Sequence, residues 1–168
     1  MNCLFPRRVA AALPVLAVWL LAGSSLWAGD WARFHGPDGQ GIGHAGEVPV
    51  EWSDHDNLKW KLEMPGRGFS SPILVGDLVF VTCYSDADGD LANLKRHLLC
   101  AGRGDGKLLW EKVVPSAAPE VRGPSFGVSH GFASHTPTSD GENVFVLFGN
   151  TGVVAFDLKG NQLWQKSV

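Results

Sequence analysis

Several features that would announce a familiar chemistry are absent from this sequence. Its three cysteines form no CxxC pair, so neither a zinc site nor a dithiol redox site is indicated. No GxSxG motif, no Walker lysine and no run of lysine or arginine occurs. After residue 28, helical periodicity never extends beyond a turn or two. Short motifs therefore point to no catalytic centre, and an all-β fold is expected.

The N-terminal stretch has the parts of a secretory signal peptide. Arg7 and Arg8 precede an apolar run over residues 9–23, which is short and contains a proline, so it is poorly suited to span a membrane. We predict cleavage after Ala28, with Ser24 as the second choice, and no stable membrane span in the mature chain. The protein is then exported to a periplasm, a cell envelope or the medium. An uncleaved membrane anchor is the alternative.

The charge of the mature chain bears on its partners. Loss of Arg7 and Arg8 leaves 12 of the 14 basic residues against 17 acidic ones, a net charge of −5. Without a basic run, such a chain is not drawn to nucleic acid by long-range attraction. We therefore expect no nucleic-acid partner.

The mature part of the chain repeats itself. Residues 71–81 (SPILVGDLVFV) and 136–146 (TPTSDGENVFV) share Pro, Gly and a Val-Phe-Val triplet at an offset of 65. Residues 98–112 and 152–166 match at an offset of 54. The difference of 11 predicts an insertion in the first copy, in a loop around residues 85–95.

Within the second matched block, Ala101 aligns with Ala155, and Gly106 with Gly160. The two glycines supply a turn before the last strand of each copy.

A tryptophan closes each copy. Trp110 and Trp164 end the two full copies, and a partial copy over residues 58–65 (LKWKLEMP) places Trp60 in the same position. A large ring near the outer strand fills the gap between neighbouring sheets, and its burial is worth a few kcal/mol, about 2–3. We therefore expect all three rings to be structural.

Each copy is expected to form four short strands, because β-branched and aromatic runs are bounded by Gly, Asp and Asn. The expected strands lie near residues 70–75, 78–84, 97–102 and 107–113, and again near 135–139, 143–149, 152–157 and 161–167. Four antiparallel strands at such a repeat are typical of β-propeller blades, and a β-sandwich is the alternative.

We therefore predict an all-β protein, a partial β-propeller of about two four-stranded antiparallel blades plus a leading strand. The predicted segments are the signal peptide (1–28), a lead-in segment (29–57), the leading strand (58–65) and two blades (70–114 and 134–168).

The repeats and the lead-in resemble one family. DGKLLW (105–110) and KGNQLW (159–164) are similar to the blade ends of pyrroloquinoline-quinone-like (PQQ-like) β-propeller repeat proteins. WARFHGPDGQGIG (31–43) looks like a segment that opens exported bacterial members, with His35 where arginine is usual. The resemblance covers residues 31–168. It implies the fold but no chemistry, because propellers host many functions.

The resemblance also implies an incomplete ring. A propeller closes with at least about four blades. Two blades leave edges and faces uncovered, which favours association. We therefore expect a partial chain, and self-assembly into a closed ring is the alternative.

Two cysteines, Cys83 and Cys100, remain after cleavage, and export places them in an oxidising compartment. If the strands that flank the insertion pair with each other, these residues lie nearly opposite one another. We predict a disulfide between them, and two unpaired core thiols are the alternative.

The insertion contains a weak calcium candidate. Asp86, Asp88 and Asp90 stand two residues apart, as in calcium loops. The glycine falls at the fourth position instead of the sixth, and His97 occupies position 12, where calcium loops carry a carboxylate. A solvated loop is therefore favoured.

The glycine-rich stretch over residues 30–43 is expected to be a turn-rich lead-in, because it lacks the GxGxxG spacing of a dinucleotide site. We expect Trp31 and Phe34 to be tucked onto the propeller. His130 and His135 are five residues apart, so an extended strand points them to opposite faces and they make a poor metal pair.

These observations favour binding over catalysis, and enzymatic activity stays an open question. Quinone-dependent dehydrogenases similar to this family carry adjacent cysteines, a catalytic aspartate and calcium ligands. None of these can be matched here, so PQQ and calcium are implied by the resemblance alone. The enzymatic alternative is a fragment of such a dehydrogenase whose active site lies on other blades.

We predict a non-catalytic binding or scaffold module. Its partner, a protein or a small molecule whose identity the sequence does not reveal, would contact loops 85–96 and 114–134 on one propeller face. A related possibility is a role like that of the propeller lipoprotein that scaffolds outer-membrane protein assembly.

Overall fold

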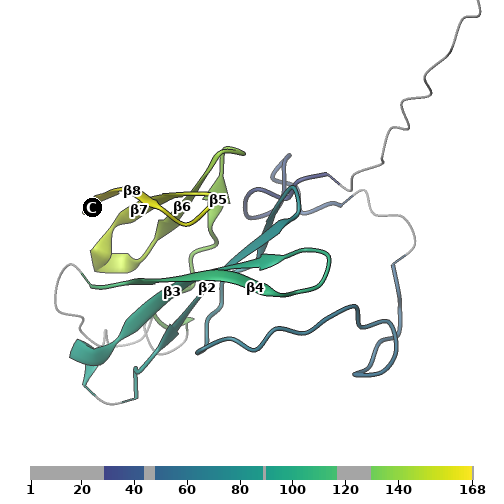
Figure 1. Ribbon diagram of the computed structural model, residues 1–168, viewed down its shortest axis with the longest axis horizontal. Coiled ribbons are helices and arrows are strands. Elements are labelled where there is room, and N and C mark those ends of the chain that lie inside the picture. Colours follow the sequence, from purple (N-terminus) through teal and green to yellow (C-terminus); the bar gives the residue numbers. More distant parts are fainter. Residues whose placement is uncertain (1–28, 44–47, 89, 117–129, 168) are drawn as a thin grey trace, which may run out of the picture.

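The computed structural model describes residues 29–43, 48–88, 90–116 and 130–167 (Figure 1). In these residues the strands form two antiparallel sheets of four, each in simple up-and-down order. The first sheet contains β1 (Ile73–Val75), β2 (Leu78–Ser85), β3 (Lys95–Gly102) and β4 (Leu108–Val114). The second sheet contains β5 (Thr138–Ser139), β6 (Asn143–Leu147), β7 (Val153–Asp157) and β8 (Gln162–Lys166). The predicted all-β architecture of four-stranded blades is confirmed.

The short connections also follow the prediction. Two 3₁₀ turns lie in the connections, η1 (Leu91–Asn93) and η2 (Gly149–Thr151). The predicted insertion is the connection from β2 to β3, which contains η1. Nowhere in the described residues is there a helix with the length and apolarity to cross a bilayer. The predicted signal peptide (1–28) and most of the predicted contact loop (114–134) lie outside the described residues.

The core lies between the two sheets. Because strand residues alternate between faces, Phe80, Leu98 and Cys100 share the inner face of the first sheet. They pack in one cluster with inner residues of the second sheet, among them Val144 and Phe156, and all are buried. Figure 1 shows the two sheets lying side by side. Burial of the facing sides therefore holds neighbouring sheets together, as between propeller blades.

One buried charge also joins the sheets. Arg96 on β3 is almost fully buried, and its Nη1 donates a hydrogen bond of 3.2 Å to Thr151 Oγ1 in the β6–β7 connection. A buried charge is costly without hydrogen bonds, so this bond favours one relative placement of the two sheets.

The lead-in segment fastens both sheets at one edge. Trp31 exchanges two backbone hydrogen bonds with Leu74 on β1, at 2.9 and 3.1 Å, and the carbonyl of Ala32 accepts from the Ser139 amide on β5 at 2.8 Å. Trp31 is thus tucked in as predicted. Phe34 is not: it is 58% exposed and stacks only on the neighbouring ring of His35.

Residues 58–65 form no strand, and the predicted leading strand is wrong on this point. The segment instead crosses the outer face of the first sheet, the face turned away from the second sheet. There Trp60, Leu62 and Met64 line an apolar pocket of 290 Å³ together with Val79 and Leu99. Side-chain packing on the face, instead of pairing along an edge, holds this segment.

The strand register corrects one detail of the predicted repeat. Two cross-strand rows correspond, Phe80–Cys100–Trp110 in the first sheet and Phe145–Ala155–Trp164 in the second. Cys100, and not Ala101, is therefore the counterpart of Ala155, and a register shift follows each of the two residues. They are 55 positions apart and the tryptophans are 54 apart, so the first copy has one extra residue in its β3–β4 turn.

Candidate functional site

The tryptophans join successive units, and the first joint is made by Trp60. Its ring lies over Gly106 in the β3–β4 turn, so close that a Cβ on this glycine would be 2.4 Å from the ring. Trp60 Nε1 donates a 2.9 Å hydrogen bond to the carbonyl of Arg103 in the same turn. Gly106 has a φ of +69°, which glycine adopts without strain.

Trp110 repeats this joint one unit later. Its ring lies over Gly160 in the β7–β8 turn, where a Cβ would be 2.9 Å away, and its Nε1 donates to the Leu158 carbonyl at 3.1 Å. Gly160 also has a positive φ, +84°. Each of these two tryptophans thus docks on the turn of the following unit.

Trp164 occupies the third position of this series on an open surface. It is 47% exposed and touches the ring of Phe145 at a centroid distance of 6.0 Å. With Leu147 and Val153, these side chains make up the outer face of the second sheet, called here the terminal face. Every residue of β8 is exposed. An apolar sheet face of this kind is suited to packing against a further element.

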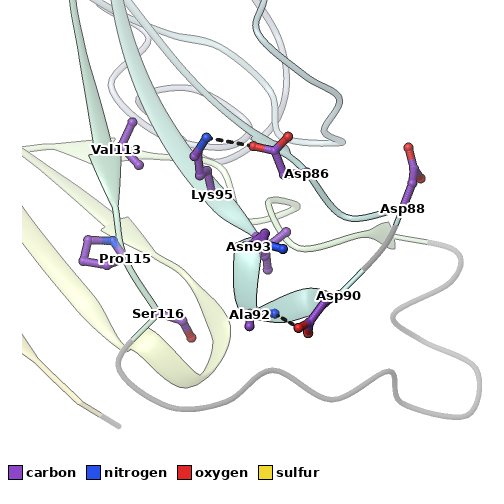
Figure 2. Close-up of a pocket in the computed structure, with 10 residues that line it drawn as sticks. Asp86, Asp88, Asp90, Ala92, Asn93, Lys95, Val113, Pro115 and Ser116 are labelled. Atoms are coloured by element: carbon purple, nitrogen blue, oxygen red, sulfur yellow. Dashed lines mark hydrogen bonds and ion pairs between the residues drawn. The ribbon is translucent and has the colours of Figure 1, made fainter.

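The β2–β3 connection builds a second surface feature, an open pocket of 890 Å³ (Figure 2). Asp86, Asp88 and Asp90 line it, together with Lys95 and Val113. Figure 2 shows the three carboxylates well separated around the loop, with Asp86 turned toward Lys95 and Asp90 toward the backbone of η1. This pocket exists only because the first copy carries the insertion.

Each of the three carboxylates has a different partner. Asp86 Oδ2 lies 3.0 Å from Lys95 Nζ. The hydrogen bond with this lysine is the main reason that the pKa of Asp86 is lowered. Asp88 pairs with Arg67, and this pair raises the pKa of the arginine. Asp90 Oδ1 accepts a 3.0 Å hydrogen bond from the Ala92 amide and caps η1.

The predicted calcium candidate is therefore not assembled as a site. Calcium takes about six to eight oxygen ligands. Within the described ranges, no three His, Cys, Asp or Glu residues are grouped in a way that could hold a metal ion. The three carboxylates instead order a polar loop.

The predicted disulfide is not formed, since Cys83 and Cys100 are both free and buried. The register pairs Cys83 with His97 and Cys100 with Phe80, so the cysteines are three positions out of alignment. An odd displacement along a strand places them on opposite faces of the sheet. Burial raises the pKa of Cys83 to about 11 and that of Cys100 to about 12.

One polar cluster was missed by the sequence analysis. Ser85 Oγ lies 2.9 Å from His97 Nε2, and His97 Nδ1 lies 2.6 Å from Glu111 Oε1. The three residues come from three strands and match no short motif. Only the strand register could have brought them together in advance.

Two antiparallel sheets, built from repeats whose tryptophans dock on the next unit, define a β-propeller repeat protein. Residues 20–168 match the PQQ-repeat family model described as "Outer membrane protein assembly factor BamB". The chain belongs to this family, which confirms the predicted PQQ-like resemblance. No curated protein matches the sequence.

The described residues do not fit the quinone and calcium that the resemblance implies. Cys83 and Cys100 are neither adjacent nor on one face. The three aspartates of the β2–β3 connection are each engaged with a different partner. We therefore derive no chemistry through either group.

Proposed function

We propose that the chain is an exported binding module that scaffolds a partner protein through the loop surface around the β2–β3 connection. The observation that carries this proposal is the 890 Å³ pocket at the β2–β3 connection, which is longer than the β6–β7 connection of the second repeat. Its lining mixes paired charges with Val113 and Pro115. Loops placed on a rigid sheet scaffold commonly carry binding function.

The family supports a role in protein assembly, since the matching model is described as an assembly factor. Two carboxylates of the pocket lining are in ion pairs, Asp86 with Lys95 and Asp88 with Arg67, and both pairs are exposed and therefore weak. Such pairs open readily to partners of either charge, and the apolar part of the lining adds contact area.

Site-specific photo-crosslinking tests this surface. A benzoylphenylalanine at Asn93, which lines the pocket, is expected to give a discrete protein adduct in cells. The same probe at Asp140, an exposed turn residue between β5 and β6 of the second sheet, is the matched control and is expected to give none. Absence of an adduct at Asn93, or equal adducts at both positions, would contradict the proposal.

Export is tested separately by the N-terminus of the mature protein. We expect it to begin at Gly29, and at Ser25 if the second cleavage choice is used. Recovery of Met1 in a cytoplasmic fraction would contradict export and leave the binding proposal standing.

For the dehydrogenase alternative, a dye-reduction assay with added PQQ and calcium is decisive, and we expect no reduction.

A further inference from the structure

A serine, a histidine and a glutamate lie in line on the outer face of the first sheet. Ser85 ends β2, His97 lies on β3 and Glu111 on β4. The distances of 2.9 Å from Ser85 Oγ to His97 Nε2 and 2.6 Å from His97 Nδ1 to Glu111 Oε1 give each ring nitrogen one partner. A base joined in this order to a hydroxyl and a carboxylate is the arrangement that activates a serine nucleophile.

The strand register creates this alignment. His97 is the cross-strand partner of Cys83, and Ser85 is two residues further along β2 on the same face. Glu111 pairs with Leu99, two residues beyond His97, and so also faces this side. Diagonal neighbours of this kind are about 7–8 Å apart at Cα, which long side chains bridge. His97 is 3% exposed, so its ring is held in place by the surrounding structure.

The single proton of the Ser85 hydroxyl has two possible acceptors. With Glu111 at Nδ1, the neutral ring carries its hydrogen there, and Nε2 accepts from Ser85; this assignment follows from the network. Asp86 Oδ2 lies 3.1 Å from the same hydroxyl and is already paired with Lys95. The hydroxyl therefore donates to His97 when the ring is neutral and to Asp86 when the ring is protonated.

Ser85 also borders a pocket of 330 Å³ at the end of β2. Arg67, Asp86 and Asp88 line the same pocket. The two carboxylates are matched by Lys95 and Arg67, so the pocket carries no net charge from these residues. Its volume is at the lower end of the range for ligand sites, which suits a small substrate.

We propose that Ser85 is a nucleophile that takes acyl groups from small esters, with His97 as its general base and Glu111 as the residue that orients the ring. Ser85 Oγ attacks the carbonyl carbon, and its proton passes to His97 Nε2. His97 returns this proton to the departing alcohol oxygen as the ester bond breaks. A water molecule then loses a proton to His97 as it attacks the acyl carbon. His97 passes this proton to Ser85 Oγ as the acyl–serine bond breaks, and the acyl group leaves as a carboxylic acid. Arg67 provides positive charge in the pocket for the developing oxyanion.

This activity is independent of the proposed binding role, and a fluorophosphonate probe tests it directly. The serine oxygen bonds to phosphorus and fluoride leaves, so peptide mass spectrometry of the full chain locates the adduct. We expect a phosphonate on Ser85. Ser70 is the internal control, because its hydroxyl donates to the Thr82 carbonyl at 3.0 Å and should stay unmodified.

Variants and pH separate a catalytic base from a structural histidine. His97→Gln should slow the labelling of Ser85 by about 100-fold or more. In the unmodified protein the labelling rate should depend on pH, and this dependence should vanish in the variant. The groups that face the ring are Glu111 from β4, Cys83 and Ser85 from β2, and Asp86 beyond it.

Because His97 is buried, its variant must first be shown to fold by near-ultraviolet circular dichroism. If it does not fold, the partly exposed Glu111 decides the question: Glu111→Gln should slow labelling and Glu111→Asp should restore part of the rate. The wild-type protein should also hydrolyse p-nitrophenyl acetate, and Ser85→Ala should not. An unlabelled Ser85 in folded protein between about pH 6 and 9, or a rate unchanged by Glu111→Gln, overturns the proposal.

Discussion

At the scale of single residues, the first sheet separates side chains that the sequence suggested were partners. Cys83 lies on the outer face of the first sheet, and Cys100 packs in the core with residues of the second sheet. Because the thiolate is the reactive form, a raised pKa makes both thiols slow to react at neutral pH.

We therefore predict two reduced, protected thiols. At pH 8, fewer than about 1% of either thiol is ionised in the folded protein, since both pKa values lie three or more units higher. Iodoacetamide should modify the Cys83 and Cys100 peptides slowly in native buffer and completely in denaturant without reductant. A peptide linked through both cysteines would contradict this.

The incorrect prediction of a disulfide shows what residue patterns leave undetermined. The sequence located the two strands correctly but gave no register between them, because the long β2–β3 connection does not fix one. A displacement of three positions is enough to turn the two thiols to opposite faces. The Ser85–His97–Glu111 cluster escaped notice for the same reason.

At the scale of elements, tryptophan rings pack directly against two turn glycines. An added side chain at either glycine would clash with the ring, which makes the contact testable. Gly106→Ala would place a Cβ 2.4 Å from the Trp60 ring at a φ of +69°. Gly39 is a matched control, since its φ is +70° and a Cβ added there would have no atom within 4 Å.

Both alanine variants carry the backbone cost of a left-handed residue, about 1–2 kcal/mol. Only Gly106→Ala should add a further cost of about 1–3 kcal/mol for displacing the ring. Urea unfolding followed by tryptophan fluorescence measures the difference. Equal losses in the two variants would show that the contact between Trp60 and Gly106 contributes nothing to stability.

Element boundaries followed from the sequence where local signals agreed. Runs such as Val144-Phe145-Val146 lie between turn residues, so β6 was predictable to within a few positions. Residues 58–65 matched the last strand of a repeat equally well, yet they form none. A strand forms there only if a neighbouring sheet offers an edge with unpaired backbone groups. The sequence of the segment alone does not show whether such an edge is present.

At the scale of the whole molecule, the two outer faces differ. The segment that contains Trp60 covers the outer face of the first sheet, whereas the terminal face of the second sheet is open. Partly exposed apolar sheet faces and free edges promote association.

We predict that the protein self-associates through the terminal face as its concentration rises. Trp164→Lys should shift it toward the monomer, because a charge on this face opposes burial. Trp52→Lys is the matched control, since Trp52 is 73% exposed in the lead-in segment and lies outside the terminal face. Sedimentation velocity measures the effect. A shift of equal size in both variants would remove the terminal face as the cause.

Each tryptophan packs on a turn that lies later in the sequence, so the packing of one unit depends on the synthesis of the next. A ribosome adds Trp110 fifty residues before it adds Gly160. During this interval the first sheet is complete, but the Trp110 ring has no Gly160 turn to pack against. Maturation of each unit is then completed by its successor. A pause in translation between these two positions would leave the Trp110 ring exposed until the β7–β8 turn is made.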